Sequence, residues 1–511
     1  MKRFRRAVAQ AMTFAAWAAV AFMILPRGAA AQEPYPGLDA YIANALKVLK
    51  VPGAAVAIVR NDSVIYTRGF GVLALGGQTP VDDRTMFEIG SSTKAFTATL
   101  VSMMVSDGKM QYDDLISKFL PDFKLYDPYA SAQVTIRDAL LHRTGVSRGE
   151  FMWIDAGTSR EDVLHRVRFL KPDAPFRSRF SYQNIMYLAV GQAAGKAGGS
   201  TWDNLIQQRI FTPLGMTSSV TSYNEITTTN VATAHAMDHD TAFKKERFNA
   251  QNIAPAGAII SNARDMAQWL RFQMSGGVVN GKRLVDSAAF LEIHTPQILM
   301  DPGSPNGGVQ PRFSTYGMGW MIQDYRHQLM WQHGGNTPGM TTAVGMLPEK
   351  KIGVVVLSNM DHTQLPDMLM HYIFDRQLGE PMHDYVAEAY KRPQSRRRPP
   401  DNTPPHVATP APLPLAAYVG TYSDSLYGKV TVAIENGNLV MTRGLAHGRL
   451  EYWNANNFRW WSNGAISGAL EFIKFEVSPD SKVLGVYYGM DPDVDLLLRE
   501  RKAGGRAGGG N

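Results

Sequence analysis

The chain contains no cysteine among its 511 residues. This absence excludes disulfide bonds, a thiol nucleophile, thiolate metal ligands and a lipid-modified N-terminal cysteine. A chain of this length can bury enough apolar surface to fold without cross-links, even outside the cell. Charged residues make up only 19% and hydrophobic residues 45%, which is typical of a soluble globular protein.

Net positive charge is small in most of the chain. The formal charge is +7, but five of the positive charges lie within residues 1–31, which contain no acidic residue. The remaining chain carries about +2, and its basic run at 391–398 lies among prolines. We therefore expect no nucleic-acid partner.

Residues 1–31 are organised like a secretory signal peptide. A basic start is followed by an apolar run from Ala7 to Leu25, and the small residues 29–31 precede Gln32. Cleavage near Ala31 and a periplasmic or secreted location are expected. The alternative is an uncleaved membrane anchor. No later run is long and apolar enough to span a bilayer, so we expect no stable membrane insertion after cleavage.

Proline composition divides the mature chain. Residues 391–412 are rich in proline and arginine and are predicted to form an extended linker. The linker separates a large unit at 32–390 from a small unit at 413–502. The glycine-rich residues 503–511 are predicted to form a flexible tail.

The large unit has strand patterns at both ends and helical periods between them. The expected strands are 51–59, 64–66, 328–332, 341–347 and 352–357, and the expected helices are 38–49, 95–105, 136–141, 185–194 and 266–274. Asn61-Asp62 predicts a hairpin between the first two strands. This order predicts an α/β unit in which an antiparallel sheet, closed by both ends of the unit, is flanked by helices and carries a helical insertion.

The small unit has the pattern of an all-β domain. Short apolar runs at 430–434 and 439–442 are joined by Asn436-Gly437, a dipeptide that favours hairpin turns. Further runs at 472–477 and 484–488 continue the pattern. A small barrel or sandwich is therefore expected.

The first motif with chemical potential is Gly90-Ser91-Ser92-Thr93-Lys94. Ser91 precedes a helical pattern, so its Oγ would lie near the positive end of a helix. Lys94 lies one turn later on the same face, and burial would lower the pKa of its ammonium group enough to make a proton acceptor. The alternative is that Ser91 or Ser92 only caps the helix. On its own this motif is weak evidence for a catalytic site, because on the order of two Ser-x-x-Lys matches arise by chance in such a chain.

The second motif, Tyr182-Gln183-Asn184, precedes another helical pattern. A tyrosine hydroxyl beside a lysine can act as a general base or acid, and Asn184 can hydrogen-bond Lys94 or a substrate amide. Alternatively, Asn184 caps the helix and Tyr182 packs at its start.

The third motif, His333-Gly334-Gly335-Asn336, follows the expected strand 328–332. Two glycines allow the backbone to lie close to a substrate, and an exposed N–H there would complete an oxyanion hole. His333 adds a group that is partly cationic near neutral pH. The alternative is a tight glycine-rich turn between strands.

The three motifs in this order resemble the penicillin-binding protein and class C β-lactamase family, especially its esterase and peptidase branch. The segments 140–145, 256–261 and 316–320 are also similar, and the resemblance covers residues 35–385. It implies the β-lactamase/transpeptidase fold. The small unit is similar to the lipocalin-like β-barrel that is appended to some members.

This resemblance implies a role for each motif residue. Ser91 would attack a carbonyl and become acylated, while Lys94 and Tyr182 relay protons. Asn184 would orient the substrate amide, and the N–H groups of Ser91 and Asn336, next to Gly335, would bind the oxyanion. No cofactor and no metal ion are implied, and the partner is a small-molecule or peptide substrate. The oligomeric state is left open.

The chain departs from the family pattern at two positions. Gln183 stands where many members have serine, and His333 stands where β-lactamases have a lysine that binds the substrate carboxylate. We therefore expect poor β-lactam hydrolysis and cleavage of amide bonds in small, linear or D-residue-containing peptides. The alternatives are a carboxylesterase and a non-catalytic protein that binds cell-wall peptides.

Two rival sites have weaker support. The segment 235–240 offers His235, Asp238, His239 and Asp240 to a metal, but its polar surroundings suggest an exposed loop. A Ser–His–Asp triad that uses His142 or His333 lacks a Gly-x-Ser-x-Gly turn around Ser91.

Overall fold

The computed structural model describes residues 35–154, 156–238, 240–301, 310–391, 410–463, 472–488 and 497–499. The predicted signal segment, nearly all of the predicted linker and the predicted tail lie outside these residues. The domain boundaries therefore remain predictions. Within the described residues, no helix has both the length and the apolar character needed to cross a membrane.

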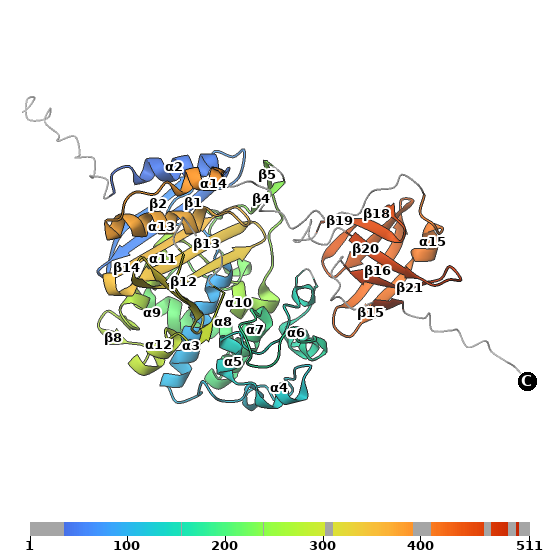
Figure 1. The fold of residues 1–511 in the computed structure, drawn as a ribbon, viewed down its shortest axis with the longest axis horizontal. Coiled ribbons are helices and arrows are strands. Elements are labelled where there is room, and N and C mark those ends of the chain that lie inside the picture. The colour runs from blue at the N-terminus through green and yellow to red at the C-terminus, as the bar shows by residue number, and fades with distance from the viewer. Residues whose placement is uncertain are drawn as a thin grey trace, which may run out of the picture. The chain divides into compact units, whose positions relative to one another are not determined.

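An eight-stranded antiparallel sheet organises residues 53–358 (Figure 1). Its strands stand in the order β2-β1-β14-β13-β12-β11-β10-β9. Their bounds are β1 Gly53–Arg60, β2 Ser63–Gly71, β9 Ile298–Leu299, β10 Ser314–Tyr316, β11 Met321–Tyr325, β12 Gln328–Thr337, β13 Met340–Leu347 and β14 Ile352–Ser358. β1 pairs with β14, with Val56 opposite Val356, so the predicted closure of the sheet by both ends of the unit is confirmed.

The predicted hairpin between β1 and β2 is present. Asn61 and Asp62 have φ values of 49° and 65°, the left-handed conformation that a two-residue hairpin turn requires. Seven of the eight residues of β1 are buried because both faces of this strand are covered. β2 extends to Gly71, beyond the three residues that the pattern predicted.

The helices have the following bounds: α2 Leu38–Val48, α3 Thr93–Ser106, α4 Pro128–Gln133, α5 Ile136–Leu140, α6 Arg160–Arg166, α7 Asn184–Gly198, α8 Trp202–Ile206, α9 Thr212–Leu214, α10 Ala254–Gly257, α11 Ala263–Met274, α12 Ser287–Ile293, α13 Leu365–Leu378, α14 Tyr385–Lys391 and α15 Leu415–Tyr418. Three short two-stranded ladders pair β3 Phe87–Glu88 with β6 Ile260–Ser261, β4 His235–Asp238 with β5 Thr241–Lys244, and β7 Val278–Val279 with β8 Lys282–Arg283.

Helices α11 and α13 cover opposite faces of the sheet (Figure 1). A Cβ added to Gly345 on β13 would lie 2.4 Å from Met370 Sδ on α13. A Cβ added to Gly353 on β14 would lie 3.2 Å from Leu270 on α11. Gly345 pairs with Val354, the residue after Gly353, and successive strand residues face opposite sides. Both glycines thus allow a helix to approach the sheet closely.

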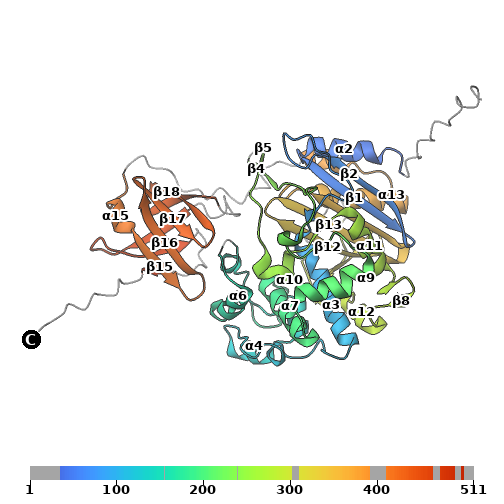
Figure 2. The ribbon, with the colours of Figure 1, turned by 180° about the vertical axis from the view of Figure 1, so that it is seen from behind.

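Helix α3 is the central helix of the insertion, where it packs with α7 and α10 (Figure 2). Every residue from Thr93 to Met104 is buried, which is typical of a helix surrounded by protein on all sides. The Phe96 ring stacks on Trp269 of α11 with centroids 3.7 Å apart. Burial of the whole helix places Lys94, in its first turn, inside the core.

The second part is a closed antiparallel barrel in which each strand pairs with the next along the chain. Its strands are β15 Gly420–Asp424, β16 Gly428–Glu435, β17 Asn438–Arg443, β18 Ala446–Asn454, β19 Asn457–Ser462, β20 Phe472–Val477, β21 Val483–Tyr488 and β22 Leu497–Arg499. Asn436 and Gly437 both have positive φ and form the predicted turn. Pairing of Tyr422 with Arg499 closes the barrel, so the predicted small all-β unit is confirmed.

A buried carboxylate, Asp138, ties the start of α5 to the loops beside it. It accepts hydrogen bonds from Thr135 N (3.0 Å), Arg143 Nε (2.6 Å) and Arg177 Nη2 (2.7 Å). Burial alone would raise the pKa of Asp138, but the bonds from Arg177, Thr135 and Arg143 lower it below its usual range. The charged form is therefore the one that stabilises the fold.

Replacing Asp138 by Asn should reduce the free energy of unfolding at pH 7 by about 3 kcal/mol, because two arginines lose their buried partner. The charged Asp138 carboxylate stabilises the folded state at pH values above its pKa in the unfolded chain, about 4. This stabilisation is lost as the pH falls through the lower pKa of Asp138 in the folded protein. Urea unfolding should therefore show a deficit at pH 7 that narrows below pH 4. Asp62→Asn removes a carboxylate from an exposed pair with Arg271 and should change the unfolding free energy by less than about 1 kcal/mol.

Candidate active site

Ser91 lies in a tight turn that leads into α3. Residues Gly90–Ser92 form a 3₁₀ turn, and Gly90 has a φ of 51°. A Cβ at Gly90 would lie 2.7 Å from Asn336 N, so only glycine fits here. The side chain of Ser92 does not cap the helix, because its Oγ donates to the His333 carbonyl at 3.1 Å. The turn therefore leaves the Ser91 hydroxyl available to the residues that surround it.

Lys94 brings a buried amine to Ser91. Its Nζ lies 3.1 Å from Ser91 Oγ, 2.7 Å from Asn184 Oδ1 and 2.9 Å from the Ala256 carbonyl oxygen. Burial lowers the pKa of Lys94 well below its usual range, and the positive charge of Arg148 lowers it further. A neutral amine is the form that can accept a proton at neutral pH.

Tyr182 brings a second proton-bearing group to the same oxygen. Its hydroxyl donates to Ser91 Oγ at 2.7 Å. Burial raises the pKa of Tyr182, so the phenol is protonated at neutral pH. The ring lies 4.4 Å from the His142 ring, and the Gln183 N–H donates to His142 Nδ1 at 3.0 Å. Tyr182 is thus held by aromatic packing on one side and by the start of α7 on the other.

The start of α7 is capped by Gln183 and not by Asn184. The Gln183 Oε1 accepts from Ile185 N at 2.8 Å. Asn184 is the first residue of the helix, and its side chain is left to hydrogen-bond Lys94. Gln183 therefore caps the helix and Asn184 binds Lys94, whereas the sequence left both roles open for Asn184.

The third motif lies within a strand. The pattern predicted that this strand ends at Gln332, but β12 continues to Thr337, and the turn falls at Pro338-Gly339. A Cβ at Gly335 would lie 1.8 Å from the Ile89 carbonyl oxygen and 3.2 Å from Ser91 N. The backbone of β12 is therefore in direct contact with the turn that carries Ser91.

His333 belongs to β12 and is buried, with an exposed fraction of 2%. Within the described chain its Nε2 hydrogen-bonds Tyr316 Oη at 3.0 Å and its Nδ1 lies 2.6 Å from the Gly334 oxygen. Burial, with a smaller contribution from the positive charge that Lys94 carries when protonated, lowers the pKa of His333 to about 3. The expected partial positive charge is therefore wrong, because the ring is neutral at neutral pH.

The side chain of Asn336 points toward β13 and the segment that follows β14. Its Oδ1 accepts from Thr341 Oγ1 at 2.8 Å, and its Nδ2 lies 3.2 Å from Asp361 Oδ1. Its backbone N is the atom that approaches Gly90. The contribution of Asn336 beside Ser91 is therefore its main chain.

The rival histidines have structural partners. The prediction of an exposed loop at 235–240 is wrong for His235, which is buried in β4, with Nδ1 2.9 Å from the Asn359 oxygen and Nε2 accepting from Leu75 N. Asp240 is exposed, as expected. His239 lies outside the described residues. Among the residues that are described, no cluster of three metal-ligating side chains occurs. His142 packs on Tyr182 as described above.

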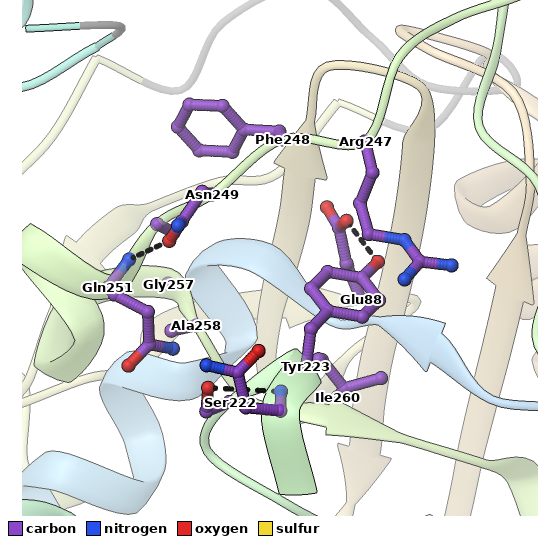
Figure 3. Close-up of a pocket in the computed structure, with 12 residues that line it drawn as sticks. Glu88, Ser222, Tyr223, Arg247, Phe248, Asn249, Gln251, Gly257, Ala258 and Ile260 are labelled. Atoms are coloured by element: carbon purple, nitrogen blue, oxygen red, sulfur yellow. Dashed lines mark hydrogen bonds between the residues drawn. The ribbon is translucent and has the colours of Figure 1, made fainter. Parts of the chain in front are cut away.

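A cavity of about 150 Å³ lies near the turn that carries Ser91, and Figure 3 shows the residues that line it. It is lined by Glu88, Ser222, Tyr223, Asn224, Arg247, Phe248, Asn249, Ala250, Gln251, Gly257, Ala258 and Ile260. A Cβ at Gly257 would lie 3.8 Å from the Gly90 carbonyl carbon, so one lining residue of the cavity lies next to the residue that precedes Ser91. Tyr223 donates a hydrogen bond to Glu88, and Arg247 Cζ lies 3.9 Å from the Tyr223 ring centroid. The sequence offered no motif that indicated Tyr223 or Arg247.

Gly335→Ala should strongly slow the reaction of Ser91 with a fluorophosphonate, because the new methyl group would overlap the Ile89 carbonyl and displace β12 from the turn. We expect labelling by a fluorophosphonate probe to slow by at least about 100-fold. The neighbouring Gly334→Ala is the matched control, because its Cβ would meet only Thr342 O at 3.6 Å. Equal labelling of the two variants would contradict the importance of this backbone contact.

Comparison with known proteins agrees with this geometry. The β-lactamase family model matches residues 38–377, and a model described as a domain of unknown function, DUF3471, matches residues 404–500. The unguisins hydrolase ungD of Aspergillus violaceofuscus is 30% identical over 501 residues, covering 89% of this chain and 88% of that protein. Penicillin-binding protein 4 of Amycolatopsis lactamdurans is 26% identical over 382 residues, covering 73% and 93%.

A solved structure shows the same fold. The octameric penicillin-binding protein homologue from Pyrococcus abyssi superposes with a TM-score of 0.61 at 22% identity, covering 90% of this chain and 98% of that chain. The family resemblance and the fold class expected from the three motifs are confirmed. The chain belongs to the β-lactamase family, and it is a serine hydrolase.

Proposed function

We propose that the protein is an exported hydrolase that cleaves amide bonds in small, linear or D-residue-containing peptides through a Ser91 acyl-enzyme. The observation that carries the proposal is the double contact at Ser91 Oγ, with Lys94 Nζ at 3.1 Å and Tyr182 Oη at 2.7 Å. Both distances are within hydrogen-bond reach, which general acid and base catalysis requires. Export is supported by the composition of residues 1–31.

The hydrogen bonds of Lys94 suggest which group accepts the first proton. A neutral amine has two N–H bonds and one lone pair. Asn184 Oδ1 and the Ala256 oxygen are acceptors and cannot donate, so each of them takes one of the two N–H bonds. The lone pair then faces Ser91 Oγ. Lys94 is therefore the base that receives the hydroxyl proton as Oγ attacks the carbonyl carbon.

The later proton transfers follow from the position of Tyr182. Attack forms the Oγ–C bond and places negative charge on the carbonyl oxygen, for which the N–H groups of Ser91 and Asn336 are the proposed donors. Collapse breaks the C–N bond, and the leaving amine takes the Tyr182 proton. The proton held by Lys94 restores the phenol. In the second half, water attacks the acyl carbon and its proton passes through Tyr182 to Lys94. The C–Oγ bond then breaks, the proton returns from Lys94 to Ser91 Oγ, and the carboxylic acid product leaves.

The substrate class rests on two features of the site. His333 is neutral and buried, so the position that carries a lysine in β-lactamases holds no permanent cation for a β-lactam carboxylate. The cavity beside Ser91 is lined by Tyr223 and Phe248 and offers space for a side chain next to the scissile bond. The names of the relatives, an unguisins hydrolase and a penicillin-binding protein, support an amide or peptide substrate.

The enzymatic proposal is tested by labelling the full-length mature protein with a fluorophosphonate. We expect one adduct, located at Ser91 by peptide mass mapping, and none in Ser91→Ala. Ser92→Ala is the matched control because Ser92 Oγ bonds the His333 carbonyl and lies in the same turn. The control should keep labelling within about threefold. An unlabelled wild-type protein would favour the non-catalytic alternative.

A substrate panel separates the remaining alternatives. Linear peptides, D-Ala-terminated peptides, short-chain aryl esters and a chromogenic cephalosporin should be compared by kcat/KM. We expect a peptide to be the best substrate and the cephalosporin to be turned over at least about 100-fold less efficiently, because no cation holds its carboxylate. Turnover of esters without turnover of any peptide would instead identify a carboxylesterase.

A further inference from the structure

The protonation state of Lys94 depends on the groups that face it, and most of them are neutral. The titratable side chains packed around Lys94 and its partner Tyr182 are His142, His333, Tyr187 and Tyr316. Burial lowers the pKa of both histidines and raises the pKa of both tyrosines. At neutral pH none of these four groups carries a charge.

The charged side chains of Arg148 and Glu150, from one short segment, lie close to the Tyr182 ring. Arg148 Cζ lies 5.2 Å from the centroid of the Tyr182 ring, and Lys94 Nζ lies 4.7 Å from that centroid. Arg148 Nε donates to Glu150 Oε1 at 3.1 Å. The side chains of Arg148 and Glu150 are 54% and 34% exposed, so both sit at the solvent side of the site.

We propose that Arg148 and Glu150 form an electrostatic control pair, in which Arg148 favours the unprotonated amine of Lys94 and Glu150 opposes it. The inference rests on the proposed function, because it assigns Lys94 the role of base. Arg148 and Glu150 touch neither a substrate nor a reacting atom. They are positioning residues that act through Lys94 and Tyr182.

Each charge of the pair acts in the same direction on Lys94 and on Tyr182. After burial, the charge of Arg148 is the next cause that lowers the pKa of Lys94, whereas Glu150 raises it. Arg148 also lowers the pKa of Tyr182, and Glu150 raises it. Arg148 further lowers the pKa of His142. An exposed pair with only a structural role would contribute little and would affect none of these groups.

The test is the pH dependence of fluorophosphonate labelling of Ser91, which needs no knowledge of the natural substrate. The acidic limb reports the base of the free enzyme. In Arg148→Gln this limb should move to higher pH, so that labelling on the limb slows about three- to tenfold. In Glu150→Gln the limb should move to lower pH, so that labelling at the same pH becomes faster. Arg148→Lys should restore the wild-type profile.

Arg209→Gln is the matched control. Arg209 forms a similar partly exposed pair with Asp107, and this pair acts on none of the three buried groups Lys94, Tyr182 and His142. Its labelling profile should match the wild type, and the thermal midpoints of all variants should agree.

The outcomes separate the two proposals. Shifts of the same direction in Arg148→Gln and Glu150→Gln, or no shift in either, would overturn the control pair while leaving the acyl-enzyme intact. Absence of Ser91 labelling in the wild type at every pH would instead overturn the proposed function.

Discussion

The site depends on the burial of one amine, that of Lys94, which lowers the pKa of this group well below its usual range. A buried ammonium is unfavourable unless it is paired, and the described core offers Lys94 amide and carbonyl oxygens instead of a carboxylate. Those oxygens satisfy a neutral amine and hold it 3.1 Å from Ser91. Helix α3 makes this possible, because it is covered on all sides from its first turn. Burial of α3 therefore underlies both the packing of the core and the chemistry of the site.

A second constraint is the contact between β12 and the turn at Ser91. The turn and the strand are separated by about 240 positions in the sequence, and closure of the sheet through β1 and β14 brings their parts of the chain together. Gly90 and Gly335 allow the two main chains to touch. A site that is built from main chain on a sheet and from side chains on α3 and α7 has little freedom to rearrange, which favours preorganised catalysis.

Much of this arrangement was predictable from the sequence. The helical period after Ser91 and the strand patterns at both ends of the unit identify α3 and the closed sheet, because alternation and helical spacing survive in buried elements. The end of β12 was not predictable, because Gly334-Gly335 has the composition of a turn and the real turn is Pro338-Gly339. The neutrality of His333 was missed because burial depends on Tyr316 and the strand packing. Arg148 and Arg247 lie in irregular segments and Tyr223 begins a single 3₁₀ turn, so no period indicates which of these side chains meet others.

The contact between Gly90 and β12 also has a consequence for how this enzyme can diversify. No side chain can be added at Gly90 or Gly335 without moving main-chain atoms, so single substitutions of these two residues are not tolerated. Residues 222–224 and 247–251, which line the cavity, lie in loops and short 3₁₀ turns, where substitutions are tolerated more readily. New substrate preferences would therefore arise by replacement in these two loops, while the catalytic apparatus is inherited unaltered.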